Sequence, residues 1–79
     1  MDHMSEKIIK VLKDMDIEDA TPESSLMGDL ELESLQIYEL LAEMEALCSV
    51  RIPERVLLKV DTVQDLADEI TKLVEKKHD

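Results

Sequence analysis

The sequence of 79 residues is poor in the residue types that supply disulfides, metal sites or catalytic bases. It has a single cysteine, Cys48, which excludes an internal disulfide and is typical of a reducing cytoplasm. Its two histidines, His3 and His78, lie at the ends of the chain, and together with one cysteine they make no plausible zinc ligand set. No histidine is placed to act as a base for a serine nucleophile. We therefore predict a protein that is not an enzyme and has no metal site.

Long hydrophobic runs are missing, and so is an excess of positive charge. No apolar stretch approaches the roughly 20 residues that cross a bilayer, and no signal-peptide pattern opens the chain. Nine Lys and Arg against 20 Asp and Glu give a formal net charge of −11. This charge repels nucleic-acid phosphates and anionic lipids, whereas it attracts basic proteins. We expect no nucleic acid and no membrane as partners, and a cytoplasmic location.

The chain does have many apolar residues at helical spacing, since 44% of its residues are hydrophobic. One apolar stripe predicts a first helix from Ser5, a possible N-cap, to about Met15. A loop of roughly 18 residues follows, which is long for a compact domain. Four apolar residues punctuate this loop and indicate that it is pinned to the core: Ile17, Leu26, Leu30 and Leu32.

Three further helices are predicted downstream. The apolar residues of 34–48 cover more than one stripe, so this helix should be central and packed on two or three sides, with Tyr38 partly buried. Pro53 suits the first position of a short helix that ends near Leu58. The last helix begins after Asp61 and Thr62, and Gln64 could complete a capping box with Asp61.

These elements predict an all-α fold, a small bundle of three long helices and one short helix with a long first loop. We expect a monomer with one domain over residues 5–75. Residues 1–4 should be a cloning remnant or a disordered start, and residues 76–79 a frayed C-terminus.

Ser34 is the residue with the most informative surroundings. It lies where the loop ends and the central helix begins, so free backbone N–H groups and the helix dipole would favour a phosphate ester there. A plain N-cap explains that position equally well. However, five carboxylates occur within ten positions of Ser34, which a cap does not need and a docking surface for basic partners does: Asp29, Glu31, Glu33, Glu39 and Glu43.

The segment 28–35 resembles the motif Asp-Leu-Gly-x-Asp-Ser-Leu of the acyl carrier protein family, whose serine carries 4′-phosphopantetheine. Residues 50–54, Val-Arg-Ile-Pro-Glu, resemble the family's entry to helix three. Residues 60–66, Val-Asp-Thr-Val-Gln-Asp-Leu, are similar to its opening of helix four. Together with the helix 35–48 these blocks lie in register without an insertion, so the resemblance covers residues 5–75.

The resemblance implies that Ser34 is the attachment site and that the chain presents acyl thioesters to enzymes of fatty-acid, polyketide or related biosynthesis. It implies two kinds of partner, a phosphopantetheinyl transferase and acyl-loading or acyl-processing enzymes with basic docking patches. The surface predicted for them consists of Asp29, Glu31, Glu33, Leu35, Glu39, Glu43 and Glu45. Two alternatives remain open: a carrier for another acyl or aminoacyl group such as D-alanine, and an unmodified acidic helical adaptor.

The sequence also departs from the family pattern. Glu31 replaces the motif's glycine and Glu33 its aspartate, while Arg55 and Lys59 add positive charge to the third helix. These departures favour a specialised carrier. Because Leu, Ile, Val and Met fill the predicted core, we also expect the bundle to open beside its second helix and shelter part of an acyl cargo.

Overall fold

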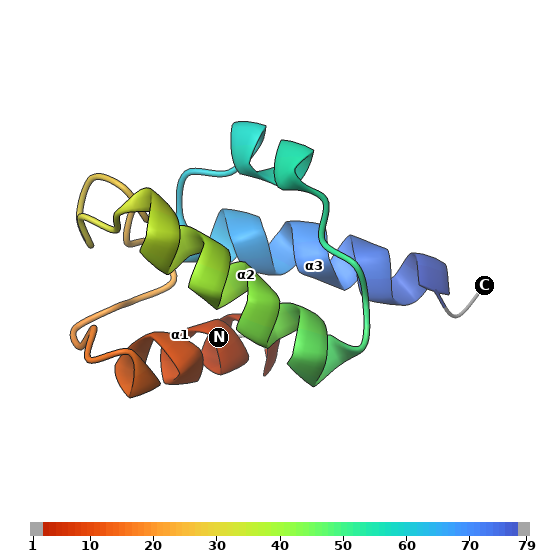
Figure 1. Ribbon diagram of the computed structural model, residues 1–79, viewed down its shortest axis with the longest axis horizontal. Coiled ribbons are helices and arrows are strands. Elements are labelled where there is room, and N and C mark those ends of the chain that lie inside the picture. The colour runs from red at the N-terminus through yellow and green to blue at the C-terminus, as the bar shows by residue number, and fades with distance from the viewer. Residues whose placement is uncertain (1–2, 78–79) are drawn as a thin grey trace.

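Figure 1 shows the computed structural model of the chain, which describes residues 3–77. Its elements are α1 (His3–Asp14), α2 (Ser34–Cys48), the 3₁₀ helix η1 (Glu54–Leu58) and α3 (Val63–Lys77). Within residues 3–77 the extended structure is limited to one isolated antiparallel bridge, between Ser25 and Thr62. The predicted all-α fold of three long helices and one short helix is confirmed.

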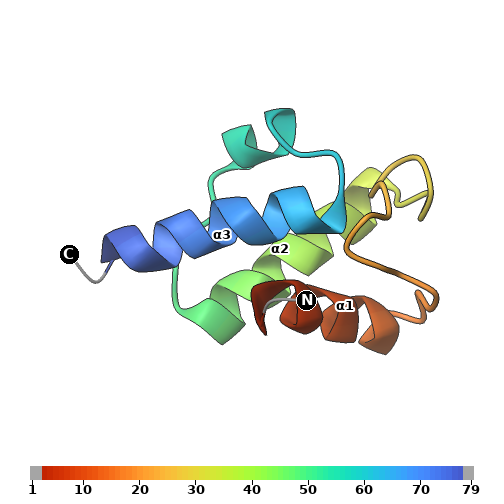
Figure 2. The ribbon, with the colours of Figure 1, turned by 180° about the vertical axis from the view of Figure 1, so that it is seen from behind.

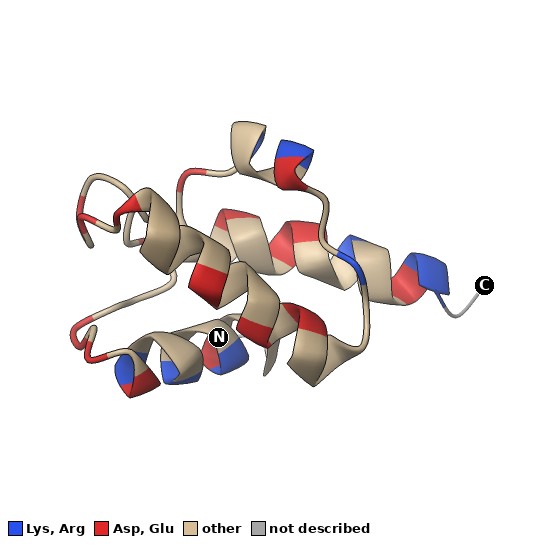
Figure 3. Ribbon diagram, in the orientation of Figure 1, with Lys and Arg blue, Asp and Glu red and all other residues tan. Residues whose placement is uncertain are grey.

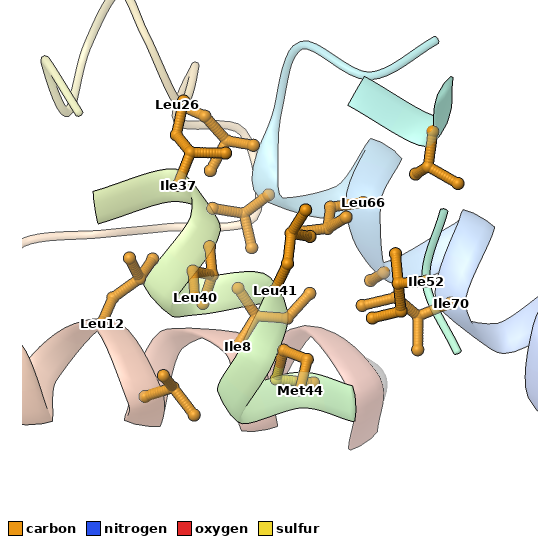
Figure 4. Close-up of a cluster of buried hydrophobic side chains, with 14 of the residues drawn as sticks. Ile8, Leu12, Leu26, Ile37, Leu40, Leu41, Met44, Ile52, Leu66 and Ile70 are labelled. Carbon is orange, nitrogen blue, oxygen red and sulfur yellow. The ribbon is translucent and has the colours of Figure 1, made fainter. Parts of the chain in front are cut away.

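The core forms where apolar stripes from the three long helices converge. Figure 4 shows Ile8 of α1, Leu40 and Met44 of α2 and Ile70 of α3 pointing into one cluster, and all four are fully buried. Helix α1 packs against both α2 and α3, while η1 packs against α3 on its other side (Figure 2). Truncating any one of these side chains to alanine would cost about 2–5 kcal/mol, because the hole left behind closes only in part.

The long first loop is pinned, as its apolar residues predicted. Leu26 and Leu32 are buried in the core. The Leu26 N–H donates to the carbonyl oxygen of Asp61 at 2.8 Å, and the Val63 N–H donates to that of Ser24 at 3.0 Å. The loop is therefore fastened to the segment that precedes α3, and this fixes the place where α2 begins.

Three expectations about helix ends are corrected. Helix α1 begins at His3, so Ser5 is not its N-cap but a buried residue of its first turn. Residues 3 and 4 of the predicted disordered start belong to this helix, and Met4 packs against the core with its sulfur 3.7 Å from the Cys48 sulfur. Helix α3 continues to Lys77, whose ammonium group donates to the Ser49 carbonyl oxygen. His78 and residue 79 of the predicted frayed end, and residues 1–2, lie outside the described residues.

The capping of α3 also differs from the prediction. The Asp65 carboxylate accepts from the backbone N–H groups of Asp61 and Thr62, both at 3.0 Å. In return, the Thr62 hydroxyl accepts from the Asp65 N–H at 3.1 Å. The capping box therefore joins Thr62 to Asp65, and not Asp61 to Gln64, because the helix begins one residue later than the predicted pair requires. The hydrogen bonds that its carboxylate accepts from the backbone N–H groups of Thr62 and Asp61 lower the pKa of Asp65.

Helix α2 is less enclosed than its composition suggested. Ile37, Leu40, Leu41 and Met44 are buried, but Leu35 and Leu47 are mostly exposed, and so in large part is Tyr38. The expectation that α2 is packed on two or three sides is therefore wrong for both of its ends.

Candidate functional site

Ser34 is the first residue of α2, and the N-cap is Glu33. The Glu33 backbone is extended, with φ −84° and ψ 162°, and its N–H donates to the Gln36 side-chain oxygen at 2.9 Å. The N-cap of α2 is therefore Glu33 and not Ser34, for which a plain N-cap role was also possible. The Ser34 side chain is exposed, and among residues 3–77 its hydroxyl has no hydrogen-bond partner.

The backbone around Ser34 favours a negative group on that hydroxyl. The first turn of α2 has N–H groups that no intrahelical carbonyl can reach, and the helix dipole adds positive potential at this end. No acidic residue lies within the first turn of α2 itself. A phosphate ester on the Ser34 hydroxyl would therefore be exposed to solvent and electrostatically favoured, and the site fits the group that the sequence implied.

Glu31 shows how the loop turns toward α2. Its φ is +51°, in the left-handed region where glycine is the least strained residue. It occupies the position of the motif's glycine, so a residue less suited to the left-handed conformation stands where the motif has the residue that adopts it most easily. The turn places Leu32 in the core and leaves Glu33 and Ser34 outside.

A groove of about 270 Å³ opens beside Ser34. Its lining is mainly apolar and comes from the loop, α2, η1 and the segment before α3: Leu26, Met27, Ser34, Ile37, Tyr38, Leu57, Leu58, Val60 and Asp61. A chain attached to the Ser34 hydroxyl would therefore begin at the rim of an apolar groove. Sequence reasoning expected shelter beside α2 but did not identify this lining, because the approach of η1 to α2 is tertiary.

One hydrogen bond crosses between α2 and η1. The Tyr38 hydroxyl donates to a carboxylate oxygen of Glu54, the first residue of η1. This hydrogen bond, and then the negative charge of the same carboxylate, raise the pKa of Tyr38 above its ordinary value of 10.0. No local pattern in the sequence indicates this pair, since the two residues lie sixteen positions apart on different elements.

Helix α2 also presents an acidic surface. It contains no basic residue, and Figure 3 shows acidic positions along its exposed length. Of the seven residues predicted for partner binding, six are exposed: Asp29, Glu31, Glu33, Leu35, Glu39 and Glu43. The basic residues lie elsewhere, on α1, in and next to η1, and near the end of α3.

The carboxylates of two predicted partner residues, Asp29 and Glu45, accept hydrogen bonds from backbone N–H groups within the fold. Asp29 accepts from the Ser25 N–H at 2.8 Å and so closes a turn of the first loop. Glu45 is half-buried and accepts from the Ile52 N–H at 2.7 Å, which holds the segment between α2 and η1. Glu45 is therefore not the outward-facing acid that the sequence suggested.

Residues 3–77 contain no cluster of three or more His, Cys, Asp or Glu side chains that could hold a metal ion. No helix in this range is long and apolar enough to cross a membrane.

Comparison with known proteins gives a consistent result. Residues 4–70 match the family described as "Phosphopantetheine attachment site". The chain is 38% identical over 68 residues to an "Acyl carrier protein" of Syntrophus aciditrophicus, covering 82% of this chain and 85% of that protein. It is 34% identical over 58 residues to an "Acyl carrier protein" of Rubrobacter xylanophilus, covering 73% and 72%. It is also 33% identical over 70 residues to a "Meromycolate extension acyl carrier protein" of Mycolicibacterium aurum, covering 89% and 72%.

Proposed function

The chain belongs to the acyl carrier protein family, and on that premise we propose that Ser34 is the residue that carries its 4′-phosphopantetheine arm. As a member of this family the chain is a carrier and not a catalyst, and the arm is covalently attached. Ser34 is supported as the attachment site because its side chain is exposed at the first position of α2 and its hydroxyl has no hydrogen-bond partner among residues 3–77.

Attachment would form one phosphoester bond on the Ser34 oxygen. The hydroxyl gives up its proton to a base of the transferase, and its oxygen bonds to the phosphorus of the arm. The phosphoanhydride bond between this phosphorus and the rest of the donor breaks, and the rest of the donor leaves with its own phosphate. The donors of the first turn and the helix dipole would stabilise the added negative charge. When bound, the arm supplies a thiol that holds the cargo as a thioester, while the protein supplies attachment and presentation.

The groove beside Ser34 supports an aliphatic cargo over a small polar one. Its walls are mainly leucine, isoleucine, valine and methionine side chains, and each methylene buried there would contribute roughly 0.8 kcal/mol before the cost of opening the groove. Burial of an alkyl acyl group against such walls would stabilise the loaded protein, whereas an amino-acid cargo such as D-alanine has little apolar surface to bury. We therefore propose that the chain acts in fatty-acid, polyketide or related acyl biosynthesis. The cytoplasmic location and the monomeric state expected from the sequence remain part of the proposal.

The proposed partners are a phosphopantetheinyl transferase and acyl-loading or acyl-processing enzymes with basic docking patches. The support is the acidic surface of α2, with exposed Glu39 and Glu43 and no basic residue on the helix. Leu35 adds an exposed apolar contact directly after Ser34. Such a surface would speed encounter with cationic partners, and the effect should weaken as salt is added.

Intact mass spectrometry tests the attachment site. The chain should gain the mass of one arm when it is co-expressed with a promiscuous phosphopantetheinyl transferase, and Ser34→Ala should abolish the gain. Ser49→Ala is the matched control, because Ser49 is an exposed serine at the other end of α2. An unmodified native chain would favour the acidic adaptor instead, and a gain that persists in Ser34→Ala would place the arm elsewhere.

A further inference from the structure

Tyr38 is the only aromatic residue of the chain, and it lies where α2 faces η1. Its side chain is 46% exposed, so burial alone does not fix the position of the ring. The hydrogen bond from its hydroxyl to Glu54 does so, by tying the middle of α2 to the first residue of η1.

Two hollows meet at this tyrosine. The first is the groove beside Ser34, and the second, of about 280 Å³, is lined by Tyr38, Glu54, Arg55, Leu57 and Leu58. Tyr38, Leu57 and Leu58 line both hollows and so form the wall between them. Of these three, only tyrosine carries a polar group, and Glu54 holds that group.

The wall on the η1 side is otherwise attached by apolar contacts with the core, through Val56 and Leu57. Helix η1 is a five-residue 3₁₀ helix in which only Val56 is buried, and Leu58 is 89% exposed. Its backbone packs more closely on α3 than on α2. The distance between η1 and α2 therefore depends on side chains, among which the Tyr38–Glu54 pair makes the directional contact.

We propose that the Tyr38–Glu54 hydrogen bond is a latch that limits the length of the acyl chain held beside Ser34. While the latch is closed, the tyrosine ring ends the groove and short alkyl chains fit. A longer chain displaces the ring and extends into the second hollow. A surface hydrogen bond of this kind is weak enough for a few buried methylenes to offset. This inference rests on the proposed carrier function, because the cargo is what fills the groove.

A series of straight acyl chains on the arm tests the latch. Loading is confirmed by intact mass, and the thermal unfolding midpoint is measured for each chain length. A chain that is buried only in the folded state stabilises it, so the midpoint should rise with length and level off where the chain meets the ring. Tyr38→Ala should move this limit to longer chains, and Tyr38→Phe, which keeps the ring without its hydrogen bond, should move it less.

Leu47→Ala is the control, since Leu47 is an exposed residue of α2 outside both hollows, and it should keep the native limit. The same limit in all loaded variants would overturn the latch and leave the carrier function standing. Failure of the native chain to gain mass would overturn the carrier function, and the latch with it.

Ultraviolet titration reports the latch directly. With one tyrosine and no tryptophan, the tyrosinate absorbance of this protein comes from Tyr38 alone. The pKa of Tyr38 is raised above 10.0 by Glu54, so a long chain that opens the latch should return the pKa toward that value, while a short chain should not. Glu54→Gln should lower the pKa of Tyr38 when the chain is short and change it little when the chain is long enough to open the latch. A pKa that stays raised with the longest chain would overturn the proposal.

Discussion

The Ser25 hydroxyl donates a 2.8 Å hydrogen bond to the carboxylate of Asp61, 36 positions further along the chain. The same hydroxyl oxygen accepts from the Gly28 N–H at 3.1 Å. One side chain therefore closes the turn before α2 and fastens it to the segment before α3. Because both bonds depend on it, Ser25→Ala should lower the free energy of unfolding by about 1 kcal/mol in urea titrations.

Gly28→Ala is expected to destabilise the protein through the same hydroxyl. A Cβ added at Gly28 would lie 3.0 Å from the Ser25 oxygen and 3.4 Å from its Cβ, so the oxygen must shift and its bonds weaken. We expect a loss of about 1 kcal/mol. In the Ser25→Ala background the added methyl meets only an ordinary contact, and the double variant should lose less than the sum of the two single losses. Additive losses would show that the crowding does not involve this oxygen.

Replacing Glu31 with glycine should stabilise the protein. The left-handed backbone costs a residue other than glycine about 1–2 kcal/mol, and Glu31→Gly would remove this cost. Glycine is also freer in the unfolded chain, which cancels part of the gain. The expected gain in the free energy of unfolding is therefore about 0.5–1 kcal/mol. Glu33→Gly, at a neighbouring position with φ −84°, is the matched control and should give no gain. Equal effects at both positions would mean that loss of a negative charge, and not backbone strain, is responsible.

Acid should weaken the start of α3 through Asp65. The backbone N–H groups of Thr62 and Asp61 lower the pKa of Asp65 below its ordinary value of 3.8 in the folded protein. The unfolded chain therefore binds the proton more readily, so this carboxylate contributes its full stability above pH 3.8 and loses it as the pH falls through its folded pKa. Asp65→Asn should destabilise the protein at neutral pH and flatten the fall in unfolding free energy below pH 4.

Asp68→Asn is the control for this prediction, since Asp68 lies on α3, beyond the capping box, and its oxygen can still accept from the Gln64 amide. The unfolding free energy of the Asp68→Asn variant should depend on pH in the same way as that of the native chain. An Asp65→Asn variant as stable as the native chain at neutral pH would contradict the assigned cap.

The sequence predicted the helices well and the surroundings of the site less well. The stripes of α1 and α3 are one-sided, so their spacing identifies the buried residues. The apolar residues of α2 cover more than one stripe, and spacing could not show that Leu35 and Leu47 are exposed, because that depends on which elements cover them. Ser34 was placed at the start of α2, but Glu33 is an uncommon N-cap and was not predicted. The Tyr38–Glu54 contact requires the tertiary position of η1, which no local pattern encodes.

The acidic surface of α2 gives the last prediction. Glu39 and Glu43 are exposed, are one helical turn apart and make no ion pair among residues 3–77. Neutralising both with glutamine should leave stability nearly unchanged, because exposed charges without partners contribute little to it. Arm transfer to Ser34 should slow by about tenfold at low salt, and the difference should shrink as ionic strength rises, since charge steering acts on encounter.

Glu18→Gln combined with Glu23→Gln removes the same net charge from two exposed positions of the first loop instead of from α2. If the protein's overall charge attracts the transferase, this control pair should slow arm transfer as much as the α2 pair does. If the position of the charge matters, only the α2 pair should slow it. Equal slowing by both pairs would overturn α2 as the docking surface, because a docking surface is defined by where its charges lie and not by how many the protein carries.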